Sequence, residues 1–444
     1  MTNATIFALA TAPVKSGIAI IRISGREATQ ALSLITSAPC PAPNLIKYSI
    51  FYNPISSKII DKGLAIYFKA PHSFTGEDTV ELHLHGSKAV ISEILEVLST
   101  ISGLRHAEAG EFTRRAFING KMDLIEAEGL ADLIDADTSA QKTQAIRQMQ
   151  GEMSEFYNNI RSQIINCMAL LEAYIDFPDE EIPDSVLDDL QNNIINLRNT
   201  VQSVLADHKR GQRLREGLRI VIVGAPNAGK SSLLNMLAGR DAAIVSHHAG
   251  TTRDVIEVEM DITGYPVILT DTAGLREAEN EIEEEGIKRA HARAGQADIK
   301  LAIFDGSKLP DIDDYTRNLL DDNTIIIISK SDLISADSPI PTSLNSPILI
   351  STKTEKNIDN LLSIIENKVK DFFESAEQPL ITRARHRSLL QEADDLLEKS
   401  LQDKPLELVC EELRRAALAI SKITGKIQVD DILDVIFREF CIGK

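Results

Sequence analysis

Residues 218–231 read Leu218-Arg-Ile-Val-Ile-Val-Gly-Ala-Pro-Asn-Ala-Gly-Lys-Ser231, an apolar strand pattern that runs directly into a glycine-rich loop and then a helical pattern. The spacing Gly-x₄-Gly-Lys-Ser between a strand and a helix predicts a phosphate-binding loop. Its glycines allow backbone N–H groups to point at phosphate oxygens, Lys230 adds a positive charge, and the Ser231 hydroxyl is placed to bind Mg²⁺. The alternative, a glycine turn that only opens a helix, is disfavoured by the motifs that follow.

A second motif lies at the end of the expected strand Val267–Thr270, which leads into Asp271-Thr-Ala-Gly274. Asp271 is placed to hold Mg²⁺ through a water, and the Gly274 N–H to sense the γ-phosphate. Between the two motifs stands Gly250-Thr-Thr-Arg-Asp254, in which we choose Thr252 to close over the γ-phosphate and complete the Mg²⁺ shell.

Two further motifs indicate which base is bound. The strand Thr324–Ile328 precedes Ser329-Lys-Ser-Asp332, and Ile348–Ile350 precedes Ser351-Thr-Lys353. The Asp332 carboxylate can accept both guanine N1–H and N2–H₂, whereas adenine presents the opposite donor and acceptor pattern. The Lys330 stem would cover the base and a backbone N–H of Ser351-Thr-Lys353 would meet guanine O6. Order and spacing resemble the GTPase superfamily, with one departure: Ser329 stands where that superfamily usually has Asn.

The residue after the Asp-x-x-Gly motif is Leu275, which cannot orient water as the glutamine of many GTPases does. Arg253 and Arg276 are candidate arginine fingers. The Asn227 side-chain oxygen is a candidate ligand for a monovalent cation beside the phosphates, with backbone carbonyls of residues 246–251 completing the shell; the alternative is that Asn227 only braces the loop. The acidic run 277–285 contains the candidate water-orienting group, although most of it is expected to be a solvated helix start.

Composition sets wider limits. The chain has 444 residues, 43% of them hydrophobic and 25% charged, which predicts about three globular domains. The formal net charge of −19 disfavours a general nucleic-acid coat or a polybasic membrane anchor. Four widely separated cysteines and the lack of a long apolar stretch favour a reducing compartment and a cytoplasmic protein without a membrane span. We interpret residues 6–12 as a first strand rather than a signal peptide.

The chain shows three kinds of secondary-structure pattern. Residues 1–119 alternate short strand patterns with turn-rich stretches and one helix near 87–99, which predicts an α+β domain. Residues 120–216 and 376–444 carry helical periodicity, broken by the acidic, proline-bearing stretch 176–183. Residues 217–375 alternate strands and helices, which predicts a parallel sheet covered on both faces. The fold class is therefore multidomain α/β and α, with a P-loop GTPase domain inserted into a split helical domain.

The motifs together resemble the MnmE (TrmE) family of tRNA-modification GTPases. Besides the loop Gly224–Asn235 and the motifs Gly250–Asp254 and Asp271–Glu277, the likeness includes Phe74-Thr-Gly-Glu-Asp78, Asp176-Phe-Pro-Asp-Glu-Glu181 and the terminal Phe440-Cys-Ile-Gly-Lys444. The resemblance covers essentially the whole chain. It implies a K⁺-activated GTPase whose G domains pair across a dimer during hydrolysis, and an N-terminal domain that resembles tetrahydrofolate-binding proteins and forms a constitutive dimer.

The resemblance also implies site residues. The catalytic glutamate falls on Glu283. K⁺ would be bound by Asn227, Ser246, His248 and Thr251, and Mg²⁺ by Ser231 and Thr252. A tetrahydrofolate derivative of the 5-formyl or methylene type would contact Arg22, Glu81, Lys121 and Lys444. The nucleotide would be bound by Asn227, Ala228, Gly229, Lys230, Ser231, Ser232, Ser246, His247, His248, Ala249, Gly250, Thr251, Thr252, Asp271, Thr272, Ala273, Gly274, Ser329, Lys330, Asp332, Ser351, Thr352 and Lys353.

Alternatives remain open for several of these residues. Arg22 and Glu81 are equally explained by a partly buried ion pair. His83 and His85 alternate on one strand as a metal pair would, without an evident third ligand. Cys441 is the family's candidate thiol, with a nucleophilic, structural or docking role.

The implied partners are a second copy of the chain, the FAD-containing protein MnmG (GidA) and tRNA, on which the family installs an aminomethyl-type group at C5 of the wobble uridine. Two basic clusters, Lys209/Arg210/Arg213/Arg215 and Arg383/Arg385/Arg387, are candidates for tRNA phosphate contact or ordinary helix-surface charge. The absence of Trp disfavours a base-stacking platform. The competing function is a regulatory GTPase in ribosome assembly that lacks modification chemistry.

Overall fold

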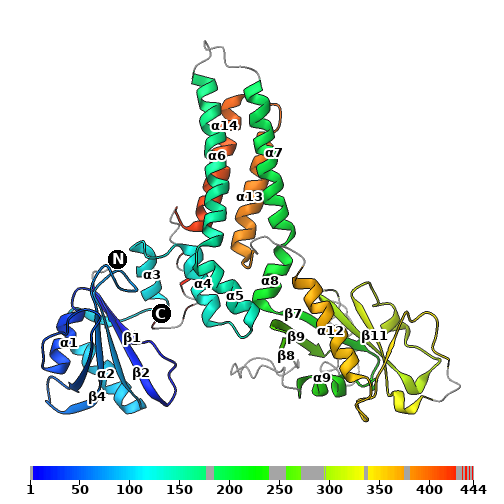
Figure 1. Cartoon of the computed structure of the whole chain (residues 1–444), viewed down its shortest axis with the longest axis horizontal. Helices are drawn as coiled ribbons and strands as arrows, with labels where there is room; N and C mark the ends of the chain where they lie inside the picture. The colour runs from blue at the N-terminus through cyan, green and yellow to red at the C-terminus, as the bar shows by residue number, and fades with distance from the viewer. Residues whose placement is uncertain are drawn as a thin grey trace, which may run out of the picture. The chain divides into compact units, whose positions relative to one another are not determined.

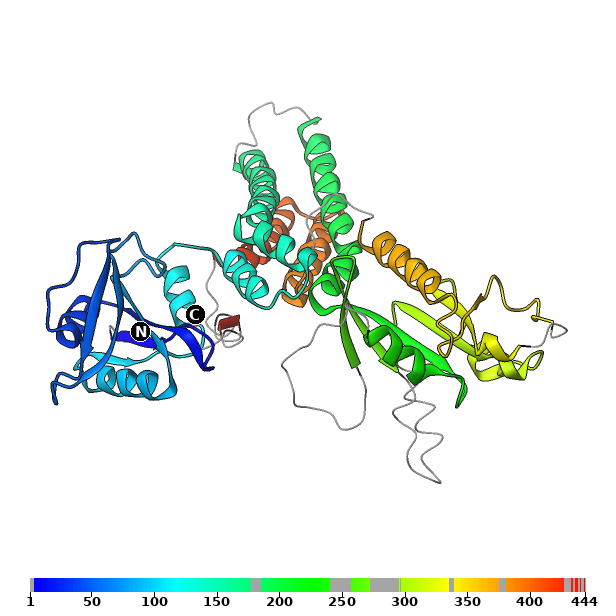
Figure 2. The same cartoon turned by 60° about the horizontal axis from the view of Figure 1, so that its bottom comes forward.

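The computed structural model describes residues 4–176, 185–239, 257–271, 297–334, 339–374 and 381–426, and the single residues 295, 433, 436, 437, 440 and 443. Contacts divide the chain into two units, one of residues 1–131, 147–179 and 405–444, the other of residues 132–146 and 180–404. Figures 1 and 2 show the elements of each unit in two views. The domain boundaries expected after residues 119, 216 and 375 remain a proposal.

The N-terminal part of the first unit is an α+β domain, as expected. Its six-stranded sheet has the order β3-β4-β5-β2-β1-β6, and only the β1–β6 pair is parallel. Its elements are β1 (Thr5–Leu9), β2 (Ser16–Ser24), α1 (Ala28–Thr36), β3 (Ile46–Tyr52), β4 (Ile59–Phe68), β5 (Thr79–Gly86), α2 (Lys88–Thr100), β6 (Leu104–His106) and α3 (Glu111–Ile118).

Alternation along the strands places different residues on the two faces of this sheet. Ile21 and Ile23 of β2 point into a core that α1 and α2 supply from one side. Phe112 of α3 joins Ile6 and Ala8 in a smaller apolar cluster. Arg22 lies between Ile21 and Ile23, so its side chain projects from the face opposite the larger core.

Long helices complete the first unit. These are α4 (Leu124–Ile134), whose last residues belong to the second unit, α6 (Glu152–Asp176) and α14 (Leu406–Thr424). α6 and α14 pack along their length, and Arg161 Nε donates to Ser421 Oγ at 2.8 Å. The expected break at 176–183 agrees with the end of α6 at Asp176 and the start of α7 at Ser185; residues 177–184 lie outside the described ranges.

The second unit contains the helices α5 (Ser139–Met149), α7 (Ser185–Ala206), α8 (His208–Glu216) and α13 (Ala384–Ser400). α7 packs against α13, where Arg198 Nε donates to Asp394 Oδ1 at 3.2 Å. α8 ends at Gly217 and the chain enters the sheet of the GTPase region directly.

That sheet has the order β12-β11-β10-β7-β9-β8. Its elements are β7 (Leu218–Gly224), α9 (Lys230–Ala238), β8 (Glu257–Ile262), β9 (Tyr265–Asp271), β10 (Ile299–Asp305), the short helices η2 (Gly306–Lys308), α11 (Asp314–Arg317) and η3 (Ser331–Leu333), β11 (Thr324–Ser329), β12 (Ile348–Leu349) and α12 (Ile358–Phe373). The pairs between β7, β9, β10, β11 and β12 are parallel, as predicted.

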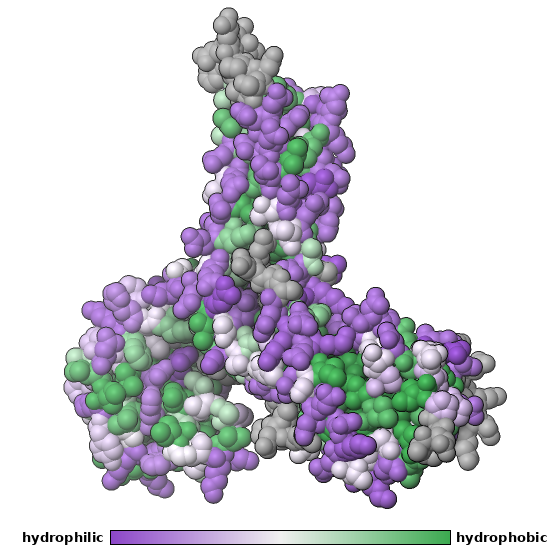
Figure 3. All heavy atoms as spheres, turned by 45° about the vertical axis from the view of Figure 1, so that its right-hand side comes forward, coloured by the Kyte–Doolittle hydropathy of each residue, from purple (hydrophilic) through white to green (hydrophobic). Residues whose placement is uncertain are grey.

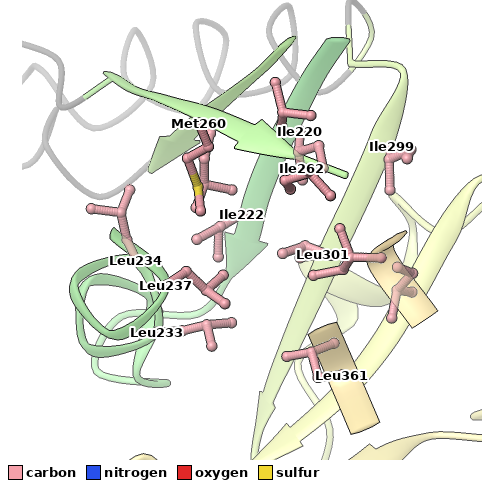
Figure 4. Close-up of a cluster of buried hydrophobic side chains, with 14 of the residues drawn as sticks. Ile220, Ile222, Leu233, Leu234, Leu237, Met260, Ile262, Ile299, Leu301 and Leu361 are labelled. Atoms are coloured by element: carbon pink, nitrogen blue, oxygen red, sulfur yellow. The ribbon is translucent and has the colours of Figure 1, made fainter. Parts of the chain in front are cut away.

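One edge differs from the prediction, because β8 pairs antiparallel with β9. Thr263 and Gly264 join the two strands with positive φ angles of 54° and 90°, the geometry of a tight hairpin turn. The sequence interpretation had not singled out β8 or the central strand β10. Figure 4 shows how Leu233, Leu234 and Leu237 of α9 meet the strands, together with Leu361 of α12.

No described helix is long and apolar enough to cross a membrane. In the view of Figure 3 the surface of the long helices is mainly hydrophilic, with hydrophobic residues in small groups. Among the described residues Cys40, Cys167 and Cys410 are free thiols; Cys441 lies outside the described ranges.

Candidate functional site

The phosphate-binding loop lies between β7 and α9, as the motif predicted. Two of its residues have positive φ, Asn227 at 62° and Gly229 at 99°. A Cβ at Gly224 would lie 2.5 Å from the carbonyl oxygen of Ile303, so only glycine permits this approach of β7 to β10. The loop therefore curls back over the end of β7 and begins α9 at Lys230.

Lys230 is buried and its ammonium group lies inside the loop. Nζ donates to the carbonyl oxygens of Gly224 at 3.0 Å and Ala225 at 2.9 Å. The backbone thus keeps the positive charge beside the loop amides, where it can neutralise the β- and γ-phosphates of a nucleotide.

Ser231 and Asp271 come from different elements and meet at the start of α9. The Ser231 hydroxyl donates to Asp271 Oδ2 at 2.7 Å, and Asp271 is buried at the end of β9. A hydroxyl and a carboxylate this close are the hard oxygen donors that Mg²⁺ prefers, so the two side chains fit the predicted metal.

Ser329 connects the base-binding motif to the phosphate loop. Its buried hydroxyl donates to the Ala228 carbonyl at 2.6 Å and lies 3.2 Å from the Phe304 carbonyl. Both side-chain hydrogen-bond contacts given for Ser329 are with backbone carbonyls inside the domain. Its role here is therefore to hold the loop against the end of β11.

Lys330 and Asp332 follow Ser329 in a tight turn. Lys330 has a φ of 51° and its Nζ donates to Asp305 Oδ2 at 2.7 Å, at the end of β10. Burial alone would raise the pKa of Asp305, but hydrogen bonds from Lys330 and Ser307 outweigh burial and lower it. The ion pair holds the Lys330 stem across the ends of β10 and β11, the position expected for covering a base.

The Asp332 carboxylate is oriented by Ser351. The buried Ser351 hydroxyl donates to Asp332 Oδ1 at 2.6 Å and lowers the pKa of that carboxyl. Ser331 N–H donates to Ile350 O at 2.9 Å, which joins the same two loops through the backbone. Thr352 and Lys353 follow in the adjoining turn. An ionised carboxylate with one oxygen already held can present its other oxygen to a guanine edge.

All these residues lie at the carboxyl ends of parallel strands, the edge at which open α/β sheets bind ligands. The structure thus brings the phosphate loop, Asp271, Ser329–Asp332 and Ser351 together. The remaining predicted residues lie outside the described ranges, namely Ser246, His247, His248, Ala249, Gly250, Thr251, Thr252, Thr272, Ala273, Gly274 and Glu283.

The second predicted site lies on the N-terminal sheet. Arg22 and Glu81 are cross-strand partners in register, and Arg22 Nε and Nη2 lie 3.0 and 2.9 Å from Glu81 Oε1. The Arg22 guanidinium lies 5.3 Å from the ring centre of Phe74 and 5.8 Å from that of Phe112. The ion pair is the one offered as an alternative from the sequence. The contacts of Arg22 with Phe74 and Phe112 were not predicted.

Lys121 approaches this region through the turn that follows Phe74. Its Nζ donates to the Pro71 carbonyl at 3.0 Å, and its Cγ would lie 3.3 Å from a Cβ at Gly76. Lys444 lies outside the described ranges.

The two histidines of β5 do not share a partner. His85 Nδ1 lies 2.9 Å from Asp61 Oδ1, whereas His83 Nε2 lies 3.5 Å from Glu81 Oε2. Within the described ranges no group of three or more His, Cys, Asp or Glu side chains is placed to hold a metal ion. The structure therefore gives no support to a metal at this pair.

A cavity of about 300 Å³ in the same domain was not foreseen from the sequence. Its lining includes the charged side chains of Glu77, Arg105, Glu111 and Arg115. The Glu111 carboxylate accepts two hydrogen bonds from Arg105, at 2.6 and 2.7 Å, and one from Arg115 at 3.0 Å. Arg115 also donates to the Glu77 carboxylate at 2.9 Å. Burial raises the pKa of Glu111, but these hydrogen bonds outweigh it, so the net shift is downward. The spacing of Glu111 and Arg115 on one helix was the available sequence signal.

The basic clusters are largely occupied by ion pairs. Lys209 and Arg213 lie 3.1 and 2.6 Å from the buried Asp298, and Arg215 and Arg383 lie 3.2 and 2.8 Å from Asp132. Asp298 Oδ2 also accepts the Arg219 N–H of β7 at 3.0 Å. These contacts favour the structural interpretation over tRNA contact for the first cluster and for Arg383 of the second.

Comparison with known proteins covers the whole chain. Residues 5–121 match the family model described as the GTP-binding protein TrmE N-terminus, and residues 124–441 match the MnmE helical domain. The tRNA modification GTPase MnmE of Paramagnetospirillum magneticum is 46% identical over 440 residues, covering 99% of each chain. The proteins of that name from Rickettsia akari and Parvibaculum lavamentivorans are each 48% identical, covering 99% of this chain and 100% of their own.

Proposed function

The chain belongs to the MnmE family of tRNA modification GTPases, and from this premise we propose that it hydrolyses GTP with Mg²⁺ and K⁺ to drive modification of the wobble uridine in tRNA. The observation that carries the GTPase assignment is the closed set of contacts from the phosphate loop through Ser231–Asp271 and Ser329–Ala228 to Asp332–Ser351. Each predicted recognition element in this set lies at the same sheet edge.

We assign roles to the individual side chains from the motifs, and the contacts above support those of the described residues. Lys230 would neutralise the β- and γ-phosphates, and Ser231 and Asp271 would hold Mg²⁺, which would offset the negative charge of those phosphates. Asp332 accepts the two guanine donors while Lys330 covers the base. Thr252 completes the metal shell and Glu283 orients the attacking water; both assignments come from motif position.

The K⁺ proposal centres on Asn227. Its left-handed backbone places it at the exposed tip of the loop, between the strand that ends at Gly224 and the helix that begins at Lys230. A side-chain oxygen there can bind a monovalent cation next to the phosphates, with Ser246, His248 and Thr251 supplying further ligands by motif position. The cation would add the positive charge that an arginine finger brings in other GTPases.

Comparison of salts tests this proposal. We expect GTP turnover to be much faster in K⁺ than in Na⁺ and Asn227→Ala to remove most of that difference. Asn235→Ala, on the exposed side of α9, is the matched control and should keep the K⁺ preference. Equal turnover of the wild-type protein in both salts would eliminate the cation from the mechanism.

A tetrahydrofolate derivative is proposed for the site at Arg22 and Glu81, with Lys121 and Lys444 as further contacts. The bound folate would supply the one-carbon unit of the modification. An ion pair beside two aromatic rings suits a flat, polar heterocycle, because the rings pack on its faces and the charged groups pair with its edge. The amine donor and the FAD-dependent chemistry would come with the partner protein MnmG.

A homodimer through the N-terminal sheet is supported by its exposed apolar residues. Ile46 and Tyr48 of β3 are 64% and 65% exposed, Ile18 of β2 is 61% exposed, and Leu64, opposite Tyr48 in the register, is also exposed. A second copy of the chain would cover this face. Tyr48→Glu should shift the molar mass measured by light scattering from two chains to one, whereas an unchanged mass would place the contact elsewhere.

Analysis of tRNA nucleosides tests the proposed function as a whole. With MnmG, GTP and a folate carrying a one-carbon unit, we expect mass spectrometry to find an aminomethyl-type group at C5 of the wobble uridine. Cells without this protein should lack the modification. Normal wobble uridines in such cells would favour the ribosome-assembly function instead.

A further inference from the structure

A third polar side chain lies beside Arg22 and Glu81 on the N-terminal sheet. His83 is two residues after Glu81 on β5, so both project from the same face. The cross-strand partners of His83 are Ile20 of β2 and Leu64 of β4. Arg22, Glu81 and His83 therefore form a continuous polar row bordered by apolar side chains.

The hydrogen bonds along this row are incomplete. Both contacting nitrogens of Arg22 lie within 3.0 Å of Glu81 Oε1. Glu81 Oε2 instead faces His83 Nε2 at 3.5 Å, which is longer than a good hydrogen bond. His83 Nε2 is buried, and within the residues that the structure describes it has no hydrogen-bond partner. Buried polar atoms are rarely left without a partner, so this gap points to a group that the described residues do not supply.

The chemistry of the gap indicates what fills it. An imidazole nitrogen that faces a carboxylate is best explained as N–H, which makes His83 Nε2 a donor and leaves Glu81 Oε2 as an acceptor. A ligand placed against both atoms must present an acceptor next to an N–H donor. The aromatic rings of Phe74 and Phe112 beside Arg22 favour a flat ligand.

We propose that His83 is a binding residue of this site and that, with Glu81, it recognises the edge of a 2-amino-4-oxo heterocycle such as a pterin. In that arrangement His83 donates to the ring carbonyl oxygen, and Glu81 Oε2 accepts from the adjacent ring N–H. This inference rests on the proposed folate function and adds to it the residue that reads the carbonyl end of the pterin edge.

Titration calorimetry of the full-length protein with 5-formyl-tetrahydrofolate tests the inference. His83→Leu keeps much of the volume and removes the donor, and it should raise the dissociation constant about tenfold, the usual effect of leaving a buried polar group unpaired. His83→Gln keeps a side-chain donor and should bind within about threefold of wild type. The exposed His72 provides the matched control, and His72→Leu should bind as wild type does.

The outcomes separate this inference from the proposed function. A wild-type protein that does not bind the folate overturns the folate function. A wild-type protein that binds it, with His83→Leu binding equally well, overturns only the role of His83. If His83→Leu melts at a lower temperature without ligand, His83→Ala provides a second variant without a donor. Weakened binding by His83→Gln equal to that of His83→Leu also contradicts the inference, because then the hydrogen bond is not what matters.

Discussion

Replacing Ser329 by alanine removes the hydroxyl that joins the base-binding strand to the phosphate loop. The hydroxyl is buried and donates to the Ala228 carbonyl at 2.6 Å, with the Phe304 carbonyl 3.2 Å away. Loss of a buried hydrogen bond of this kind costs about 1–3 kcal/mol. The cost falls on the conformation of the loop that binds phosphate, so part of it appears as weaker nucleotide binding.

If about 1 kcal/mol of that cost is expressed in binding, Ser329→Ala should raise the GDP dissociation constant about fivefold. Fluorescent GDP titration and dissociation kinetics measure this change. Ser329→Thr keeps the hydroxyl and should restore most of the affinity. The inosine nucleotide IDP, which lacks the 2-amino group, should be weakened by the same factor as GDP, because Ser329 touches the loop and not the base.

Two results would refute this reasoning. Wild-type GDP affinity in Ser329→Ala would show that the loop keeps its conformation without the hydroxyl. A changed ratio of GDP to IDP affinity would show that Ser329 acts on the base.

The other predictions concern separate residues. Asp332→Asn exchanges an acceptor for a donor, so binding should move from GDP toward XDP in competition titrations, and a retained GDP preference would contradict the proposed base contact. Glu283→Ala should abolish GTP turnover while fluorescent GTP still binds; unchanged turnover would move the role to a neighbouring acidic residue. Glu111 has a lowered pKa in the folded protein, so its ion pairs stabilise the fold above the ordinary carboxyl pKa and lose that contribution as the pH falls through the lowered one. Chemical denaturation should therefore find Glu111→Gln destabilised at pH 7 and nearer to wild type in acid, and a pH-independent difference would count against this.

The nucleotide site was largely predictable because its motifs are short and contiguous. Gly224–Ser231, Asp271 and Asp332 are each identified by their immediate neighbours in sequence, and the parallel strands bring them to one edge. The contacts between the motifs were not predictable. The Ser329 hydroxyl donates to the Ala228 carbonyl, 101 positions away in the sequence, and no local sequence pattern predicts that a serine in place of the usual Asn makes this hydrogen bond.

The N-terminal site shows the same limit. The alternation of polar residues on Val80–His85 predicted a shared face, and the register confirms that Arg22 lies opposite Glu81. The sequence pattern treated His83 and His85 as equivalent. The structure separates them because Asp61 captures His85 at 2.9 Å from the neighbouring strand. Which strand supplies a partner depends on sheet order, and alternation along one strand carries no information about it.

The carboxylate of Asp298 has a consequence for how mutational surveys of this protein are interpreted. It is fully buried, it accepts the Arg219 N–H, and two cations of α8, Lys209 and Arg213, neutralise it. Removing one partner of a buried ion pair costs about 3–5 kcal/mol where the remaining charge loses its compensation, and without Arg213 the cation left beside Asp298 is the largely exposed Lys209. A substitution at Arg213 would therefore unsettle the first residues of β7 and β10, whose far ends carry the nucleotide site. In a screen for RNA-binding residues such a variant would show a loss of function. The cause would be disturbed packing of the GTPase sheet and not a lost contact with RNA.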